Sequence, residues 1–257
     1  MAVSVEKRGA VAMVTFNRPP VNSYNREFVD ELNGAVDEVR FDEAVRVAIV
    51  TSALPKFFSA GADIKMFQES TLAYKTMVVL HAHEVLSKIE RTPKVWIAAI
   101  GGHALGGGLE IALACDLRFA GEGDYRIGLP EAKLGLLPGN GGTQRLPRLI
   151  GRGRALNLML TGDAVGPQPA LELGIVDRLY PADQLLDKTL EYANILAEGA
   201  PMALGNIKVA TTLGGQTNLD AGMAIEREAV WRLFPTEDVA EGIAAQLERR
   251  APNFKGR

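Results

Sequence analysis

The alternation of short apolar runs with amphipathic segments most constrains the fold of this chain. Three runs, Val11–Phe16, Val45–Val50 and Val95–Ile100, are almost wholly apolar and rich in β-branched residues, as are strands buried on both faces of a sheet. Between them, apolar residues recur every three or four positions, first over residues 28–39 and then over 72–89, which is the period of an amphipathic helix. Strands that alternate with helices predict an α/β fold with parallel strand pairing.

The chain changes character from about Thr143 onward, where strand patterns almost vanish. We expect helices at Arg152–Leu160, Pro169–Leu173, Gln184–Glu198, Ala203–Thr211 and Leu219–Phe234. The apolar faces of the last segments have no strands left to cover, so they must pack on the core or on another copy of the chain. We therefore divide the chain into a core, residues 1–195, and a helical region for self-association, residues 196–257.

The balance of charge and the cysteine content exclude several classes of function. The 257 residues carry 28 Lys and Arg against 31 Asp and Glu, a net charge of -3, whereas nucleic-acid-binding domains are usually basic. Cys115 is the one cysteine, which excludes an internal disulfide and a cysteine-rich metal site and favours a reducing compartment. No targeting segment and no apolar run of about 20 residues is found, so we expect a cytoplasmic protein without membrane contact.

Three segments that follow or adjoin predicted strands carry the candidate site: residues 57–65, 103–110 and 129–143. The carboxyl ends of parallel strands share one edge of a sheet, so these loops are expected to converge on one crevice. The triplet Gly106–Gly108 opens a helix, whose free N–H groups favour an anion or a developing oxyanion. Tight strand–helix packing is the alternative reason for these glycines. Neither a phosphate-binding Gly-Lys-Ser/Thr loop nor a dinucleotide fingerprint is present.

Two acidic residues stand out by their surroundings. Glu110 lies among apolar residues in the first turns of the predicted helix, where an isolated charge is costly. It is either functional, or favoured by the positive helix end, or paired with an arginine such as Arg145. Glu131 follows Pro130 in a loop, where a solvated carboxylate is the alternative. Two carboxyl groups held close together would separate their pKa values, as paired acid–base chemistry requires.

The histidines and the serine of these segments are weaker candidates. His81 and His83 lie two positions apart in a predicted helix, so they cannot share a metal ion, and we expect His83 to be a packed helix residue. His103 precedes the glycine triplet and could line a pocket. Ser59 lacks the Gly-x-Ser-x-Gly nucleophile motif. The sequence therefore predicts no metal site and no serine nucleophile.

The three segments FSAGADIK at 58–65, HALGGGLEIALACD at 103–116 and LPEAKLGLLPGNGGTQRLPRLIG at 129–151 resemble the enoyl-CoA hydratase/isomerase (crotonase) superfamily, and bacterial enoyl-CoA hydratases above all. The resemblance extends over almost the whole chain. It implies a ClpP-like spiral of ββα units with a C-terminal helical trimerisation region. It also implies an acyl-coenzyme A substrate of fatty-acid metabolism, a homotrimer or a hexamer built as a dimer of trimers, and no cofactor beyond the coenzyme A of the substrate.

The resemblance also assigns roles to individual residues. Glu110 and Glu131 match the two catalytic glutamates of the hydratases, and the N–H groups of Ala62 and Gly107 match the oxyanion hole. The N–H of Gly139 would hold the attacking water. Contacts with coenzyme A are expected from a larger set: Pro20, Val21, Ala60, Asp63, Ile64 and, from an adjacent chain, Arg249.

Several positions depart from the common pattern of the superfamily. Tyr24 stands where a small aliphatic residue is frequent, Gly101 where asparagine is usual, and Gln246 where an aromatic residue often lies. These departures affect acyl-chain preference and coenzyme affinity. The predicted reaction is syn addition of water to a 2-enoyl-CoA, giving the 3-hydroxyacyl-CoA. Two alternatives are enzymes: a Δ3,Δ2-enoyl-CoA isomerase and a specialised hydratase such as one for 3-methylglutaconyl-CoA. A third is a non-catalytic member of the same fold that binds acyl-CoA or RNA, although the net negative charge of the chain disfavours RNA binding.

Overall fold

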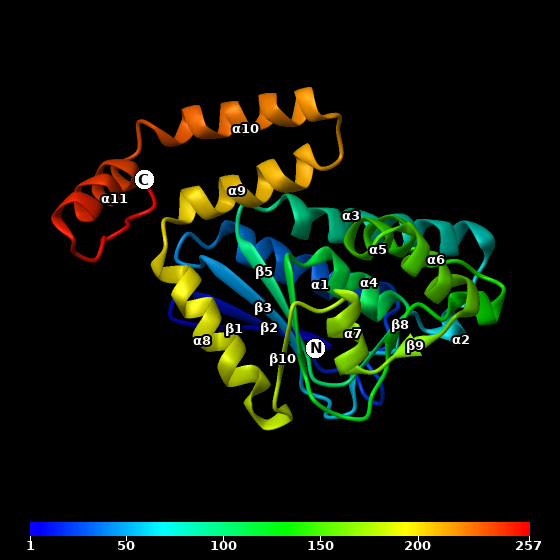
Figure 1. Ribbon diagram of the computed structural model, residues 1–257. Helices are drawn as coiled ribbons and strands as arrows, with labels where there is room; N and C mark the ends of the chain where they lie inside the picture. Colours follow the sequence, from blue (N-terminus) through cyan, green and yellow to red (C-terminus); the bar gives the residue numbers. More distant parts are fainter.

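A repeated strand–strand–helix pattern builds two sheets in the computed structural model, which describes residues 1–257 (Figure 1). The larger sheet has the order β1-β2-β3-β5-β7-β10. Its strands are β1 (Val3–Arg8), β2 (Val11–Phe16), β3 (Val47–Ser52), β5 (Val95–Ile100), β7 (Leu117–Gly121) and β10 (Arg178–Tyr180). All neighbours in it are parallel except β1 and β2. The predicted α/β fold with parallel pairing is confirmed.

The smaller sheet has the order β4-β6-β8-β9. Its strands are β4 (Phe57–Ser59), β6 (His103–Leu105), β8 (Ile127–Gly128) and β9 (Ala164–Val165). Along the chain, β3, β5 and β7 of the larger sheet are each followed by a strand of the smaller one. The chain thus winds as the expected spiral, and each turn sends a helix or loop from the smaller sheet toward the same region.

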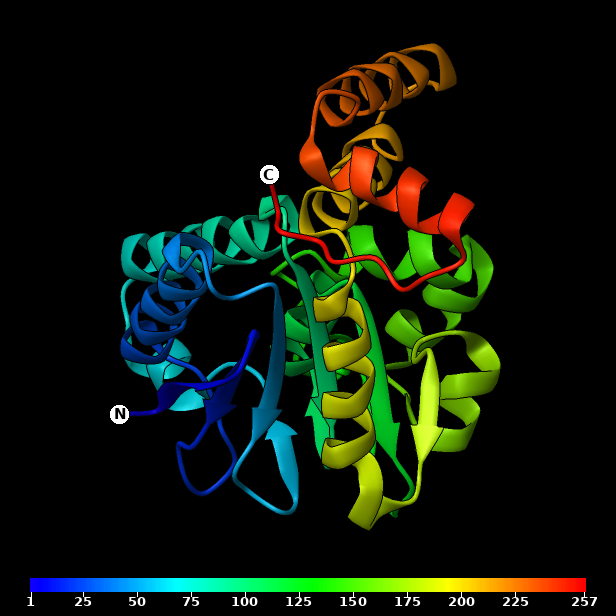
Figure 2. The ribbon, with the colours of Figure 1, turned by 90° about the vertical axis from the view of Figure 1, so that its left-hand side faces the viewer.

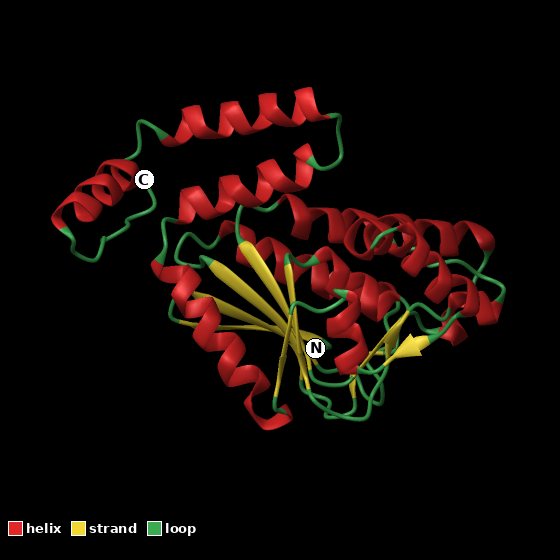
Figure 3. Cartoon of the chain, in the orientation of Figure 1, coloured by secondary structure: helices red, strands yellow, loops and turns green.

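The helices cover both faces of the larger sheet (Figure 3). They are α1 (Arg26–Phe41), α2 (Ile64–Glu69), α3 (Leu72–Arg91), α4 (Gly107–Ala114), α5 (Gly142–Ile150), α6 (Arg152–Thr161), α7 (Pro167–Leu173), α8 (Leu185–Glu198), α9 (Pro201–Gly214), α10 (Leu219–Leu233) and α11 (Glu237–Glu248). Two short 3-10 helices, η1 (Glu131–Leu134) and η2 (Ala182–Gln184), complete the set. The five helical segments expected after Thr143 are all present, and α5 and α11 add to them.

Strand β3 shows why the apolar runs of the sequence are continuous. Ala48 and Val50 face the main core, which lies under α1, α3 and α4, whereas Val47 and Ile49 face a second cluster that is closed by α8. Figure 2 shows α8 lying along this second face of the sheet. Because successive strand residues point to opposite faces, both sets must be apolar.

The structure adds strands that the sequence patterns did not predict. Strand β1 carries mostly charged and exposed residues and pairs with one neighbour at the sheet edge. Strands β9 and β10 have two and three residues, which is too short for a period to be recognised. They complete the edges of the two sheets in the region where we expected almost none.

The C-terminal helices project from the core. Helices α9 and α10 run side by side, and α11 lies beyond them (Figures 1 and 2). Large apolar side chains on the last two helices are exposed in the single chain, among them Trp231, Phe234 and Leu247. Helix α9 is nevertheless tied to the core, because Lys208 forms an ion pair with Asp116 at 2.9 Å and donates to the Ile89 carbonyl. The expected boundary at residue 195 falls within α8 and stays a prediction.

Candidate active site

One cavity of about 320 Å³ lies where the three glycine-containing segments meet. Its walls come from the end of β4, the start of α4, η1 and the loop that precedes α5, and the mouth carries apolar side chains such as Ile64 and Leu137. The cavity contains both candidate glutamates. The expected convergence of the three segments therefore occurs in the fold.

Glu110 lies in the first turn of α4 and is only 1% exposed. Its Oε1 accepts hydrogen bonds from the N–H groups of Asn140 and Gly142, both at 2.7 Å. Burial raises the pKa of this carboxyl, while the two N–H donors oppose that shift. The carboxyl group is thus held rigidly at the cavity wall by the loop that begins α5.

Glu131 begins η1 directly after Pro130. Its Oε2 is buried and has no hydrogen-bond partner in the chain. Burial raises the pKa of Glu131 to about 7, and the nearby negative charge of Glu110 contributes to the increase. Near neutral pH this group is therefore poised between its acid and carboxylate forms, which suits a proton donor or acceptor.

Backbone donors lie beside the carboxyl groups, since a Cβ on Gly106 would lie 2.8 Å from Glu131 Oε1. Gly107 is the first residue of α4, so its N–H has no acceptor within the helix. The segment of Gly61 and Ala62 passes directly beside it, since a Cβ on Gly61 would lie 3.0 Å from the Gly107 nitrogen. Gly61 has φ +89° and Gly106 has φ +54°, which explains why glycines stand at both turns. Ala62 and Gly107 both line the cavity, and the close approach of Gly61 to Gly107 brings the two segments together.

Arg145 supports the loop that holds Glu110. It binds both carboxylate oxygens of Glu90 at 2.7 Å and donates to the Asn140 carbonyl at 2.7 Å. The alternative interpretation of Glu110 as the partner of Arg145 is therefore wrong: Glu90 is the partner. Arg145 acts on Glu110 through the loop and through its charge, which favours the carboxylate form.

Tyr24 lines the cavity beside Gly107. Its ring packs so tightly on Gly107 that any side chain at position 107 would overlap it. Its hydroxyl accepts a hydrogen bond from the Asn140 side-chain amide. Burial, together with the charges of the two glutamates, raises the pKa of the Tyr24 phenol far above its ordinary value, so the group stays neutral. The sequence marked Tyr24 as unusual, but only the fold shows that it meets Asn140.

The residues expected to contact coenzyme A are placed unequally. Ala60, Ile64 and Gly139 line the cavity. Val21 lies beside Ala60, because its carbonyl accepts the Ala60 N–H at 3.0 Å. Asp63 caps α2 and pairs with Arg18 at 3.2 Å rather than lining the cavity.

Two further members of that set lie outside the cavity. Pro20 is exposed in the turn after β2. Arg249 ends α11 in the left-handed conformation, with φ +55°. Both views of the chain place α11 far from α2 (Figures 1 and 2). A role for Arg249 therefore requires a neighbouring copy of the chain, as the prediction states.

The histidines differ from expectation at one position. His83 is exposed, and its Nε2 lies 2.6 Å from the Gly139 carbonyl oxygen. The expectation of a packed helix residue is wrong, because His83 lies on the exposed side of α3, where it contacts the loop before α5 instead of the core. His103 stacks on Phe57 and accepts the Arg126 N–H at 3.0 Å, outside the cavity.

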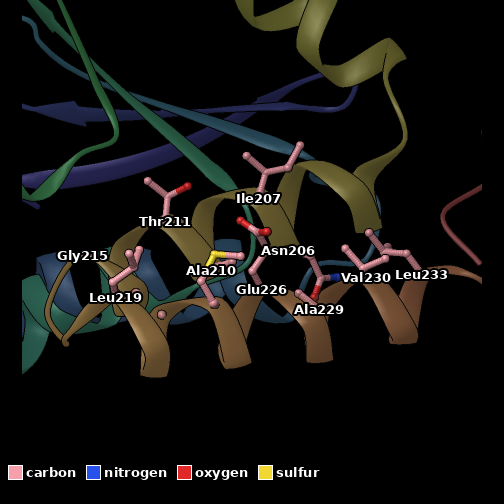
Figure 4. A pocket seen from close by; sticks show the side chains of 13 residues that line it. Asn206, Ile207, Ala210, Thr211, Gly215, Leu219, Glu226, Ala229, Val230 and Leu233 are labelled. Atoms are coloured by element: carbon pink, nitrogen blue, oxygen red, sulfur yellow. The ribbon is translucent and has the colours of Figure 1, made fainter.

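A second cavity, of about 360 Å³, lies between α9 and α10 (Figure 4). Its lining is mostly apolar or small, and Glu226 is its one charged side chain. No group of three or more His, Cys, Asp or Glu side chains in the structure could hold a metal ion. No helix has the length and apolar character needed to cross a membrane.

Known proteins resemble this chain in sequence and in structure. Residues 6–257 match the family described as enoyl-CoA hydratase/isomerase. A short-chain-enoyl-CoA hydratase of Clostridium acetobutylicum is 38% identical over 99% of this chain and 98% of its own length. The 2,3-dehydroadipyl-CoA hydratase of Escherichia coli is 37% identical over 98% of each chain.

A solved structure gives the same result for the fold. The crystal structure of an enoyl-CoA hydratase from Geobacillus kaustophilus shares 47% identity and superposes with a TM-score of 0.97, over 100% of this chain and 97% of the other. Relatives of this kind confirm the crotonase fold and the expectation of a hydratase enzyme. At these identities and over this length, the chain belongs to the enoyl-CoA hydratase/isomerase family.

Proposed function

We propose that the protein adds water syn across the 2,3 double bond of a 2-enoyl-CoA and releases the 3-hydroxyacyl-CoA. One observation carries the proposal: Glu110 and Glu131 face the same cavity as the backbone of Ala62 and Gly107. Paired carboxyl groups serve water addition, whereas backbone donors stabilise the charge that develops on the thioester oxygen.

The reaction can be written with each group in a defined role. The thioester oxygen accepts hydrogen bonds from the N–H groups of Ala62 and Gly107. Glu110, as the carboxylate, takes a proton from water, and the water oxygen forms a bond to C3. Electrons of the double bond move toward the thioester oxygen, giving an enolate that the two N–H groups stabilise.

Glu131, as the acid, then gives its proton to C2, and the enolate returns to the thioester. The net change is addition of OH to C3 and of H to C2. Transfer of the proton from Glu110 to Glu131 restores the starting state. Because the formal oxidation at C3 is balanced by the reduction at C2, the step needs no oxidant or reductant and, in this proposal, no cofactor beyond the coenzyme A of the substrate.

The pKa of Glu131 supports its role as the acid, because burial raises it to about 7 and the group retains a proton near neutral pH. Burial also raises the pKa of Glu110, but the two backbone N–H bonds that its carboxyl group accepts oppose this rise and favour the carboxylate form. The N–H of Gly139 donates no hydrogen bond within the chain and lies in the cavity wall, where it would hold the attacking water.

The placement of coenzyme A and the assembly belong to the same proposal. Coenzyme A would pass over Ala60, Val21 and Ile64 at the cavity mouth, with Pro20 and Asp63 nearby. The exposed apolar side chains of α10 and α11 support a homotrimer, alone or paired as a hexamer, in which Arg249 reaches the site of a neighbour. The single free thiol, at Cys115, supports a cytoplasmic setting.

Incubation with crotonyl-CoA in water enriched in heavy oxygen tests the reaction. The proposal expects one heavy oxygen at C3 of the product, because the new hydroxyl derives from water. A parallel reaction with a 3-enoyl-CoA tests the isomerase alternative. Unlabelled product, or conversion of the 3-enoyl-CoA without any hydration, would overturn the proposal.

A further inference from the structure

The candidate active site has an apolar space behind it. A cavity of about 10 Å³ lies between α1, α3 and α4, and its apolar lining includes Phe28, Val29, Leu86 and Ile111. Tyr24 and Asn140 are the two residues that line both this small cavity and the active-site cavity. These two hydrogen-bonded side chains, the Tyr24–Asn140 wall, therefore lie between the active-site cavity and a small apolar cavity.

The wall is held in place from several sides. The Tyr24 N–H donates to the Gly61 carbonyl at 2.9 Å, and the Tyr24 carbonyl accepts the Asp63 N–H at 2.9 Å. The ring rests on Gly107, and Tyr24 is 6% exposed. Asn140 is held in turn by the hydrogen bond from its N–H to Glu110. Rotation of the phenol away from this position would break contacts with groups on both sides.

The ring also lies close to the proposed reaction centre. The ring touches Gly107, which would bind the thioester oxygen. The negative charges of Glu110 and Glu131, which would flank C2 and C3, raise the pKa of the phenol. With coenzyme A placed over Ile64 at the mouth, as proposed above, the acyl chain beyond C3 is directed away from the mouth. An inward-growing acyl chain then meets the phenol.

We propose that Tyr24 is a specificity-determining residue that ends the acyl site and restricts the enzyme to short, unbranched 2-enoyl-CoA substrates. This inference rests on the proposed hydration and specifies its substrate class. Removal of the ring would open the active-site cavity toward the apolar side chains of α1 and α3 that line the small cavity. The volume vacated by the ring would then accept additional methylene groups. Each methylene buried in an apolar pocket changes specificity by about 10- to 200-fold.

The first experiment compares kcat/KM for crotonyl-CoA, 2-hexenoyl-CoA and 2-octenoyl-CoA. The wild type should prefer crotonyl-CoA. Tyr24→Leu should raise the ratio of hexenoyl to crotonyl activity by about tenfold or more. Tyr24→Phe, which keeps the ring and removes the hydroxyl, should leave this ratio within about threefold of wild type, even if both rates fall.

Val29→Ala provides a second control, because Val29 lines the small cavity but not the active site. Alone it should leave the ratio unchanged, since Tyr24 still closes the site. Combined with Tyr24→Leu it should increase the preference for hexenoyl-CoA further. Circular dichroism and urea unfolding establish that each variant is folded.

A binding measurement separates this inference from the proposed hydration. Calorimetry with butyryl-CoA, hexanoyl-CoA and octanoyl-CoA requires no turnover, and Tyr24→Leu should improve the binding of the longer chains relative to butyryl-CoA. A shifted binding preference without hydration of any substrate would overturn the proposed function alone. Hydration of crotonyl-CoA with the same chain-length preference in wild type and Tyr24→Leu would overturn this inference alone.

The wild type decides the question if Tyr24→Leu does not fold. Hydration of 2-octenoyl-CoA as efficiently as crotonyl-CoA would show that long chains leave the site by another route, past Phe67 or Leu137 at the mouth, and would overturn the inference. A steep fall in kcat/KM from crotonyl-CoA to octenoyl-CoA, with a parallel fall in the affinity of the saturated acyl-CoAs, would support it.

Discussion

The cavity beside α4 and the groove between α9 and α10 have similar volumes, about 320 and 360 Å³, but different chemistry. The first holds two carboxyl groups with raised pKa values and a wall of backbone donors. The second holds one carboxylate, Glu226, among apolar and small residues. Volume alone therefore does not identify a reactive site. Buried titratable groups and unpaired donors do.

The same comparison holds for the apolar side chains of the two regions. In the core, strands such as β3 and β5 are covered on both faces. On α10 and α11, Trp231 is 56% exposed, Phe234 65% and Leu247 80%. A surface of this kind is expected to be covered by another subunit. In our proposal the core carries out the reaction, and the projecting helices form the contacts between subunits.

The largest expected effect is the loss of kcat when either carboxyl group of the core is replaced by an amide. Glu110→Gln and Glu131→Gln should each lower kcat for crotonyl-CoA by about 10²–10⁴, because each removes one proton-transfer group while keeping its size. Glu226→Gln is the matched control in the other cavity and should leave kcat unchanged. Steady-state kinetics check all three. Full activity in either core variant would remove that residue from the mechanism.

The next effect concerns α9, which joins the projecting helices to the core. Lys208 is buried against Asp116, so Lys208→Met should reduce the free energy of unfolding by about 3 kcal/mol by leaving a buried charge unpaired. Urea denaturation measures the change. Lys188→Met, which removes the exposed ion pair with Glu191, should change stability little. Equal stability of the two variants would show that α9 is not anchored by this pair.

A smaller change should follow from charge placed on the exposed apolar surface. Trp231→Glu should lower the mass measured by light scattering from that of a trimer or hexamer toward that of one chain of 27.6 kDa, because a charge cannot be buried without a partner. Lys188→Glu, a charge reversal at an exposed position of α8, should leave the assembly intact. A monomeric wild type would contradict the proposed role of these helices.

The smallest expected effect is a change in the pKa of Glu131 when the charge of Glu110 is removed. Glu131 must hold a proton to act as the acid, so kcat/KM should fall as the pH rises through its pKa of about 7. Glu110→Gln removes a neighbouring negative charge and should lower the pKa of Glu131. Carbon NMR of labelled glutamate follows this titration in both proteins. An unchanged pKa would show that the two groups do not interact.

Much of the core and the site could be predicted from the sequence, because the signals are local. The run Val95–Ile100 coincides with β5, and the glycine triplet does open α4. Glu110 and Glu131 do share one cavity. A carboxyl group in an apolar turn and glycines before a helix are visible in a few neighbouring residues, and the resemblance joined them into one site.

The remaining features depend on contacts between distant residues. Tyr24 and Asn140 are 116 positions apart, and Arg145 and Glu90 are 55 apart. No local pattern indicates which residues will meet over such separations. Strands β9 and β10 were missed for a different reason, since elements of two or three residues have no measurable period.

The double variant Glu110→Gln/Glu131→Gln tests most directly the central claim that the two carboxyl groups act as one unit on a shared substrate. Residues that serve one step are far from additive, so the double variant should lose about as much kcat as the more damaged single variant, within about tenfold. The measurement is single-turnover hydration of crotonyl-CoA by the wild type, both single variants and the double variant. A loss equal to the product of the two single losses would show that the groups act independently, and would contradict the account.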